Sequence, residues 1–233
     1  MGQGTAVLLG QSLHKKFMLG NTEVRALDGV DITLVRGQMV VLLGPSGSGK
    51  TTLLHVLSGL EKPDEGSVTV DGKSIYLLND AKLSRLRSEM FGFIFQSYNL
   101  LSSLTALENV EIPLRVTGKP HARRRALDML ARVGLAERAH HRPGQLSGGE
   151  QQRVSIARAV VCEPQIVFAD EPTGNLDSST SADIISLLSA LVVERNAACL
   201  MVTHNTELAE LADRTFYLRD GHLADFNVRH ARG

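Results

Sequence analysis

The sequence contains few cysteines and few aromatic residues, and its charges cancel. Two cysteines occur among 233 residues, tryptophan is absent, and aromatic residues make up 4% of the chain. Cys162 and Cys199 lie far apart and match no metal-ligand spacing, so we expect a reducing compartment rather than a disulfide scaffold. Lysine plus arginine and aspartate plus glutamate both number 25. Without a basic surplus, a general nucleic-acid binder is not expected.

Long hydrophobic runs are also missing. No apolar stretch approaches the ~20 residues that a membrane-spanning helix needs, and residues 1–10 lack the basic start and cleavage site of a secretion signal. We therefore expect a cytoplasmic chain that reaches a membrane only through a partner. The hydrophobic content of 43% is enough for one substantial core.

The sequence does contain a phosphate-binding loop. Gly44–Thr51 has the form G-x-x-x-x-G-K-[ST], follows a strand-like apolar run at Met39–Leu43 and precedes a helical pattern at Thr52–Gly59. The alternative, a chance glycine-rich turn, does not account for this strand and helix. Glycines let successive N–H groups point at an anion, and the helix dipole adds positive potential there. The predicted nucleotide-binding residues of this loop are Gly44, Pro45, Ser46, Gly47, Ser48, Gly49, Lys50, Thr51 and Thr52.

Two of these residues have separate roles, and one aromatic residue lies upstream. Lys50 offers a point charge to the β- and γ-phosphates, and the Thr51 hydroxyl is a predicted Mg²⁺ ligand. Phe17 could stack on an adenine ring. Its own surroundings in the sequence favour the alternative that Phe17 packs in the core.

Strand patterns predict a small antiparallel sheet beside the P-loop strand. Thr5–Phe17 has the pattern of an edge strand, Val24–Val35 alternates apolar and polar residues, and Gly66–Gly72 ends in a hairpin signal. A second hairpin is expected over Thr215–Phe226. Helical patterns occupy residues 81–90, 105–133 and 180–194, the second broken at Pro113 and at residues 118–120.

Four apolar runs of buried-strand character each end in polar residues. These residues are the P-loop, Gln96, Asp170 with Glu171, and His204. Strands flanked by helices predict an α/β fold with a parallel sheet covered on both faces. Ligands of such sheets bind beyond the carboxyl ends of the strands. The four groups can therefore converge on one nucleotide.

Each group suits one part of phosphate-bond hydrolysis. Asp170 is suited to Mg²⁺, Glu171 to polarising the attacking water as a base, and His204 to contacting the γ-phosphate. Gln96 can bridge the metal and the water. A glutamine or histidine alone at a strand end is more often a satisfied polar group, so the hypothesis depends on the whole set.

A second glycine-containing motif occupies Leu146–Gln151, with the sequence Leu-Ser-Gly-Gly-Glu-Gln. Ser147 is a good N-cap, and the glycines leave backbone N–H groups open at a helix start, which predicts a second anion-binding terminus. A capping box alone would explain Ser147 and Glu150, but not the two glycines between them.

This motif resembles the signature of ATP-binding-cassette (ABC) ATPases, and the similarity extends over nearly the whole chain. The resemblance implies a single α/β cassette with a P-loop NTPase (RecA-like) core, a small antiparallel β subdomain and an inserted helical subdomain. The ranges expected are 37–59, 77–96 and 159–233 for the core, 1–36 and 60–76 for the β subdomain, and 97–158 for the helical subdomain.

The resemblance also assigns roles and ligands. ATP and Mg²⁺ are the implied cofactors, and all expected catalytic positions are filled, so active hydrolysis is expected. Asn205 replaces the aspartate usual after the switch histidine, and Phe17 replaces a tyrosine that is more common. The implied roles are adenine stacking for Phe17, the Q-loop for Gln96, Walker B and the catalytic base for Asp170 and Glu171, the D-loop for Asp177, the switch for His204, metal contacts for Thr51, Gln96 and Asp170, and action across a dimer for Leu146, Ser147, Gly148, Gly149, Glu150 and Gln151.

The implied partners are a second copy and a membrane protein. Two cassettes would face each other head to tail around ATP, and an integral membrane permease would dock near Gln96 and the helical subdomain. The chain would then lie on the cytoplasmic face of the cell membrane. The chain is similar to one branch of the family, which contains lipoprotein-releasing, macrolide-exporting and cell-division ATPases, at Val24–Leu27, Phe93–Gln96, Asn99–Leu101, Leu104–Val110 and Thr173–Asp177. Within this branch, His140–Pro143 is similar to the lipoprotein-releasing member.

Three other functions remain as alternatives. The chain could serve an amino-acid or peptide importer or exporter, or it could be a nucleotide switch that barely hydrolyses. A soluble clamp on DNA or ribosomes is disfavoured, because such clamps usually carry a coiled-coil insertion or two cassettes, and neither is evident here.

Overall fold

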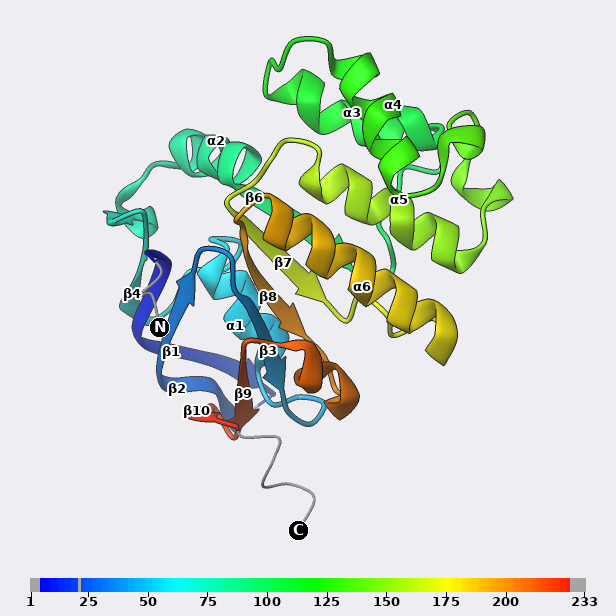
Figure 1. The fold of residues 1–233 in the computed structure, drawn as a ribbon. Coiled ribbons are helices and arrows are strands. Elements are labelled where there is room, and N and C mark those ends of the chain that lie inside the picture. The colour runs from blue at the N-terminus through cyan, green and yellow to red at the C-terminus, as the bar shows by residue number, and fades with distance from the viewer. Residues whose placement is uncertain (1–4, 21, 227–233) are drawn as a thin grey trace.

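The computed structural model describes residues 5–20 and 22–226, which form two sheets and the helices around them (Figure 1). The larger sheet has six strands in the order β10-β9-β3-β8-β7-β6. All neighbours are parallel except β10, which is antiparallel to β9. The predicted α/β class is confirmed. The strands are β3 (Met39–Leu43), β6 (Phe91–Phe95), β7 (Ile166–Asp170), β8 (Ala198–Val202), β9 (Arg214–Arg219) and β10 (His222–Asp225).

Alternate side chains of the central strands point to opposite faces of the sheet and pack into two hydrophobic cores. Val41 and Leu43 of β3 point into one core, and Val40 and Leu42 point into the other. The first core lies against α5 (Gly148–Val160) and α6 (Ser178–Glu194), and the second against α1 (Lys50–Leu57) and the smaller sheet. A strand covered on both faces needs an unbroken apolar sequence. This explains why β3 and β8 are buried at all positions.

The smaller sheet is antiparallel, in the order β2-β1-β4-β5. Its strands are β1 (Ala6–Leu19), β2 (Thr22–Val35), β4 (Glu65–Val70) and β5 (Lys73–Ser74). The prediction of an edge strand at Thr5–Phe17 is wrong, because β1 pairs with β2 on one side and with β4 on the other. The strand that covers the second edge of β1 is β4, which follows α1 in the chain. No pattern within β1 itself therefore indicates this pairing.

The helical part lies on the side of the six-stranded sheet away from the smaller sheet (Figure 1). There α3 (Ala106–Val116) packs on α4 (Ala122–Arg132) and on α5. The predicted break at residues 118–120 is confirmed. The break predicted at Pro113 is wrong: the residue lies inside α3. Proline removes one N–H donor and crowds the carbonyl four residues back, but Val110 and Leu114 are fully buried on either side of it and their packing holds the helix together.

The remaining elements connect these layers. They are α2 (Asp80–Met90) and four short 3-10 helices, η1 (Ile75–Leu77), η2 (Ala136–Arg138), η3 (Pro143–Gln145) and η4 (Thr206–Leu211). The parallel strands β3, β6, β7 and β8 end at one edge of the sheet, so the polar segments that follow them are brought together. The subdomain boundaries given above stay a prediction.

Candidate functional site

The P-loop follows β3 and depends on its glycines. Gly44, Gly47 and Gly49 all have positive φ angles, of 154°, 78° and 99°. A Cβ added at Gly44 would lie 2.3 Å from the carbonyl oxygen of Leu218, and one at Gly49 would lie 2.2 Å from that of Ala26. The loop is thus pressed against β9 and β2, and only glycine fits at these two positions.

Lys50 closes the loop from within. Its Nζ donates hydrogen bonds to the carbonyl oxygens of Gly44 and Pro45, both at 2.8 Å, and the residue is only 8% exposed. Burial lowers the pKa of this ammonium, and the carboxylates of Glu171 and Asp170 partly offset the effect. A cation held in this way can exchange carbonyl partners for phosphate oxygens at little entropic cost.

Thr51 and Asp170 meet across the sheet edge. The Thr51 hydroxyl lies 3.2 Å and 3.4 Å from the two carboxylate oxygens of Asp170, at the end of β7. Burial raises the pKa of Asp170, and its bond to Thr51 opposes that rise. A hydroxyl beside a half-buried carboxylate is an oxygen donor set of the kind that Mg²⁺ takes. In the same loop the buried Ser48 hydroxyl has no hydrogen-bond partner among the described residues.

Glu171 and His204 form a second pair at the same edge. Glu171 Oε1 and His204 Nδ1 are 2.9 Å apart, and the Glu171 N–H bonds to Val202 O, continuing the pairing of β7 with β8. Glu171 has a φ of 47°, which is uncommon outside glycine and places backbone strain at this predicted site residue. Its side chain is 17% exposed, against 68% for His204. The carboxylate is therefore sheltered but reachable by water.

Gln96 comes after β6 but is bonded to a different group. Its Nε2 donates to Asn175 Oδ1 at 3.4 Å, and Asn175 Nδ2 donates to the Gln96 carbonyl at 3.0 Å. The structure thus joins Gln96 to the loop that precedes α6 rather than to Thr51 or Asp170 by a direct bond. Sequence reasoning missed Asn175 as this partner, and only its place in a glycine-containing turn after Glu171 could have suggested it.

Asp177 is the N-cap of α6. Its carboxylate accepts bonds from the backbone N–H groups of Ser179 and Thr180 and from both of their hydroxyls, at 2.7–3.1 Å. These bonds hold the pKa of Asp177 well below its usual range. Within one chain the side chain is fully engaged in starting the helix.

The signature stretch begins α5 with a complete capping box. Ser147 Oγ accepts from Glu150 N at 3.2 Å, and Glu150 Oε2 accepts from Ser147 N at 2.8 Å. The glycines also have a packing role, because a Cβ at Gly149 would lie 2.8 Å from Thr180 Cγ2. Leu146 is buried, and its carbonyl accepts from Gln151 Nε2 at 3.1 Å. Capping and close packing therefore explain the motif within one chain.

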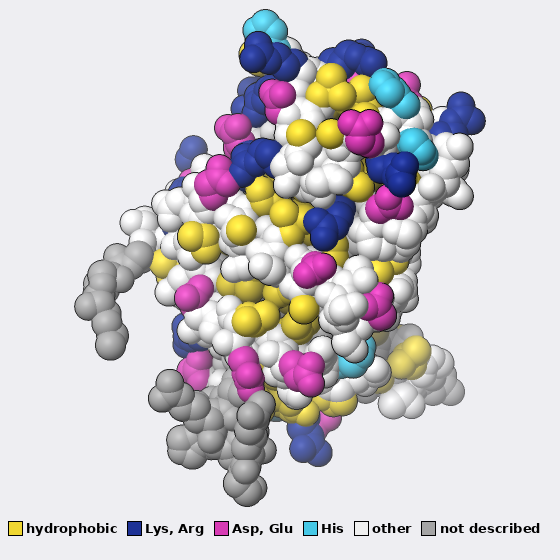
Figure 2. Space-filling model, turned by 45° about the vertical axis from the view of Figure 1, so that its right-hand side comes forward, with side chains coloured by type: hydrophobic (Ala, Val, Ile, Leu, Met, Phe, Trp, Pro, Cys, Tyr) yellow, Lys and Arg dark blue, Asp and Glu magenta, His cyan; other side chains and the backbone are white. Residues whose placement is uncertain are grey.

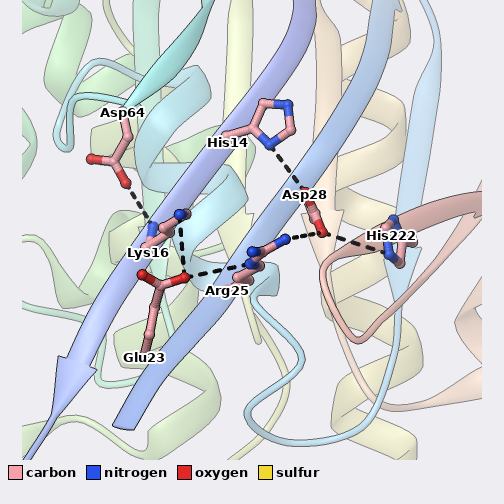
Figure 3. Close-up of polar contacts among 7 residues, drawn as sticks. All are labelled: His14, Lys16, Glu23, Arg25, Asp28, Asp64 and His222. Carbon is pink, nitrogen blue, oxygen red and sulfur yellow. Dashed lines mark hydrogen bonds and ion pairs between the residues drawn. The ribbon is translucent and has the colours of Figure 1, made fainter. Parts of the chain in front are cut away.

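Phe17 does not pack in the core. The residue lies on β1 opposite Val24 of β2 and is 41% exposed. Figure 3 shows the charged side chains that surround this part of the β1–β2 pair, with Glu23 contacting both Lys16 and Arg25. The core alternative considered for Phe17 is wrong, because the residue is exposed, while its stacking on an adenine stays a prediction.

A P-loop at the carboxyl end of a parallel sheet, with a hydroxyl–carboxylate pair and a carboxylate–imidazole pair beside it, defines a P-loop nucleotide hydrolase. The family is more specific. The sequence model of the ABC transporter family matches residues 27–174. The chain belongs to this family and is an ABC transporter ATPase.

Relatives and solved structures agree with this assignment. The chain is 44% identical to the lipoprotein-releasing system ATP-binding protein LolD of Legionella pneumophila (strain Paris), over 93% of this chain and 96% of that protein. It is 46% identical to the macrolide export ATP-binding/permease protein MacB of Azoarcus sp. (strain BH72), over 95% of this chain but only 34% of that protein. A dimeric post-hydrolysis structure of the cassette MJ0796, bound to ADP and Pi, matches with a TM-score of 0.86 and 39% identity, over 94% of this chain and 99% of that chain.

Among the described residues, no helix has the length and apolar character to cross a bilayer. On the face shown in Figure 2, lysine and arginine are most frequent at the top, over the helical part, while acidic and hydrophobic side chains are interspersed elsewhere.

Proposed function

We propose that this ATPase binds ATP between two head-to-tail copies and uses its hydrolysis to drive a membrane partner. The observation that carries the proposal is the Glu171–His204 pair at 2.9 Å, next to the strand end where Asp170 meets Thr51 of the P-loop. A sheltered carboxylate and a histidine beside a P-loop are suited to the hydrolysis of a phosphoanhydride.

The proposed chemistry divides the steps of hydrolysis among these side chains. Residues 44–52 bind the phosphates, and Lys50 transfers its hydrogen bonds from the loop carbonyls to them. Glu171 accepts the proton of the attacking water, and His204 orients the γ-phosphate. Thr51, Asp170 and Gln96 would hold Mg²⁺, which supplies positive charge beside the phosphates when bound.

The second copy is proposed to complete the site. Ser147 is exposed at the start of α5, so the signature motif Leu146–Gln151 can present this residue to the ATP of another chain. Asp177 lies at the start of the neighbouring α6 and would line the same interface. This arrangement makes ATP a bridge between subunits, and the conformational work is the difference between ATP affinity in closed and open dimers.

A groove beside Gln96 is the proposed docking place of the membrane partner. It has a volume of about 480 Å³ and is lined by Phe91, Phe93 and Phe95 of β6 and by Pro113 and Val116 of α3, among others. Val116 is 72% exposed. An apolar groove of this kind suits a short helix of a permease, in the helix-in-groove mode.

The similarity to LolD and MacB favours lipoprotein release or export as the transport task. A partner with few membrane spans and a large external domain is expected, and the chain would lie on the cytoplasmic face of the membrane through that partner. The alternatives are the ATPase of an amino-acid or peptide importer or exporter, and a soluble cassette clamp.

Replacing Glu171 with Gln tests the chemistry. We expect ATP turnover to fall by at least about a hundredfold, because a general base typically contributes 10²–10⁴-fold, while ATP binding remains and a dimer accumulates. Turnover is measured as phosphate release, and the dimer by size-exclusion chromatography with ATP. Glu137→Gln, on the surface of η2, is the control. Wild-type turnover in Glu171→Gln would contradict the base assignment.

The same variant tests the partner. Tagged Glu171→Gln protein is captured with ATP from its own cells in mild detergent and analysed by mass spectrometry. A membrane protein with few spans and a large external domain supports the proposal, while a permease with many spans favours the importer alternative. Val116→Glu should abolish the capture without changing ATP affinity, whereas Val193→Glu, 63% exposed on α6, should not. Recovery of only ribosomal or DNA-associated proteins would contradict a membrane partner.

A further inference from the structure

Lys15 lies against the ring of Phe17 and is held there by the segment that follows the P-loop helix. Its Nζ is 5.5 Å from the centre of the ring, within the range of a cation–π contact. The same ammonium bonds to Glu61 Oε1 at 2.7 Å and to the Lys62 carbonyl at 2.8 Å. The Lys15 side chain is only 12% exposed, while Phe17 remains 41% exposed.

The partners of Lys15 are tied to α1. The Glu61 N–H bonds to the carbonyl of His55 in the last turn of α1, and the Glu61 carbonyl accepts from the Tyr76 hydroxyl at 2.6 Å. A continuous set of contacts thus runs from the helix that begins at the P-loop, through Glu61 and Lys15, to the ring of Phe17.

Asp64 fixes the backbone around Lys15. Its N–H bonds to the His14 carbonyl at 2.8 Å, and its carboxylate accepts from the Lys16 N–H at 2.7 Å and lies 3.5 Å from Lys15 Nζ. Figure 3 shows Asp64 on one side of this strand and Glu23 on the other, where it contacts the Lys16 ammonium. Adjacent lysines therefore have different tasks: Lys16 pairs across β1 and β2, and Lys15 supports the ring.

We propose that Lys15 is a positioning residue for the nucleotide base: its anchored ammonium covers one side of the Phe17 ring and holds it ready to stack a purine on the uncovered side. This rests on the proposed function, the binding of ATP, and on the adenine stacking that the family resemblance implies for Phe17. A ring fixed before binding loses less rotamer freedom when the base arrives. The contribution is to the base alone, because the bonds of Lys15 within the described residues go to Glu61, Lys62 and Asp64 and not to the P-loop.

The test compares ATP with inorganic tripolyphosphate, which lacks the base. Both are titrated with Mg²⁺ into the full chain by calorimetry. Lys15→Met keeps the aliphatic stem and should weaken ATP about two- to fivefold, the size of an exposed cation–π contact, while tripolyphosphate affinity stays the same. Lys16→Met is the matched control and should change neither. Phe17→Leu should weaken ATP more, at least about fivefold by loss of stacking, and adding Lys15→Met to it should have no further effect.

Several outcomes would overturn the proposal: unchanged ATP affinity in Lys15→Met, equal losses for ATP and tripolyphosphate, an equal loss in Lys16→Met, or additive losses in the double variant. Glu61→Gln provides a second route if Lys15→Met unfolds, and it should give a smaller loss that is again confined to ATP. Failure of the wild-type chain to bind ATP at all would instead refute the proposed function, so the two failures are distinguishable.

Discussion

The N-termini of α1 and α5 both contain glycine, but they differ in capping: α5 has side-chain caps and α1 has none. Gly49 caps α1 without any side-chain bond, and its first turn holds no acidic residue. Ser147 and Glu150 cap α5 from both sides, which places a carboxylate in the first turn. Arg138 lies 3.0 Å from that carboxylate, which has its pKa lowered chiefly by the backbone bond from Ser147.

The difference bears on what each terminus can bind. A helix terminus that has no side-chain cap, and a buried lysine beside it, leaves backbone N–H groups and the positive end of the helix dipole for an anion to bind. A capped terminus with its own carboxylate already has part of that need met. That the signature forms a second anion-binding terminus stays a prediction, and its capping differs from that of the P-loop helix. We infer that α1 dominates phosphate affinity and that α5 contributes through the Ser147 hydroxyl and the remaining N–H groups, when a second chain brings ATP to it.

The largest effect is expected from adding a methyl group at the start of α1. Gly49→Ala would put Cβ 2.2 Å from the Ala26 carbonyl oxygen at a φ of 99°. Strain of this kind costs about 1–3 kcal/mol even before the clash is counted. We expect loss of ATP binding and a lower thermal unfolding midpoint, measured by calorimetry. Gly47→Ala has open space around its Cβ and should be milder. Equal behaviour of the two variants would remove the packing argument.

A smaller but more selective effect is expected at Lys50. Lys50→Met removes the charge and keeps the stem, so ATP affinity should fall about ten- to a hundredfold, the equivalent of a lost charge-assisted bond of about 1.5–3 kcal/mol. Stability should rise slightly or stay unchanged, because burial already lowers the pKa of this ammonium. Equilibrium binding and denaturant unfolding measure the two quantities. Retained tight ATP binding would contradict the inference that the start of α1 contributes more to phosphate affinity than the start of α5.

At α5 we expect a loss of stability and of dimer turnover, but no loss of ATP affinity. Ser147→Ala removes the cap and should cost about 1 kcal/mol of unfolding free energy. Monomer affinity for ATP should not change, while turnover by the dimer should fall. Denaturant unfolding, ATP titration of dilute protein and a turnover assay separate these effects. A loss of monomer ATP affinity would mean that the signature acts within its own chain.

The smallest effect is expected from the acid dependence at the start of α6. The pKa of Asp177 is held below its ordinary value of 3.8, so the unfolded chain binds this proton more readily than the native chain. Its contribution to stability is present above pH 3.8 and is lost as the pH falls below it. Asp177→Asn should make stability less steeply pH-dependent in that range, as measured by urea midpoints, and Asp183→Asn on the same helix is the control. An unchanged slope would show that the cap bonds are not formed in solution.

Much of the fold was predictable because its signals are local. The runs that form β3, β6, β7 and β8 are almost entirely apolar, and each ends in or is followed by a polar group that the parallel topology had to bring to one edge. The P-loop was predictable for the same reason, since its glycines and Lys50 all lie within Gly44–Lys50. The place of β1 between β2 and β4 was not, because β4 returns from beyond α1 to cover its second edge.

By itself, the sequence determined the chemical groups of the site and the strands that carry them, because hydrophobic period and glycine spacing act over a few residues. Only the tertiary structure decided which groups meet. It paired Gln96 with Asn175 and Glu171 with His204. It also placed the Lys15 ammonium between Glu61 and the ring of Phe17. These contacts join segments far apart in the chain, and packing of the two cores against one sheet sets their distances.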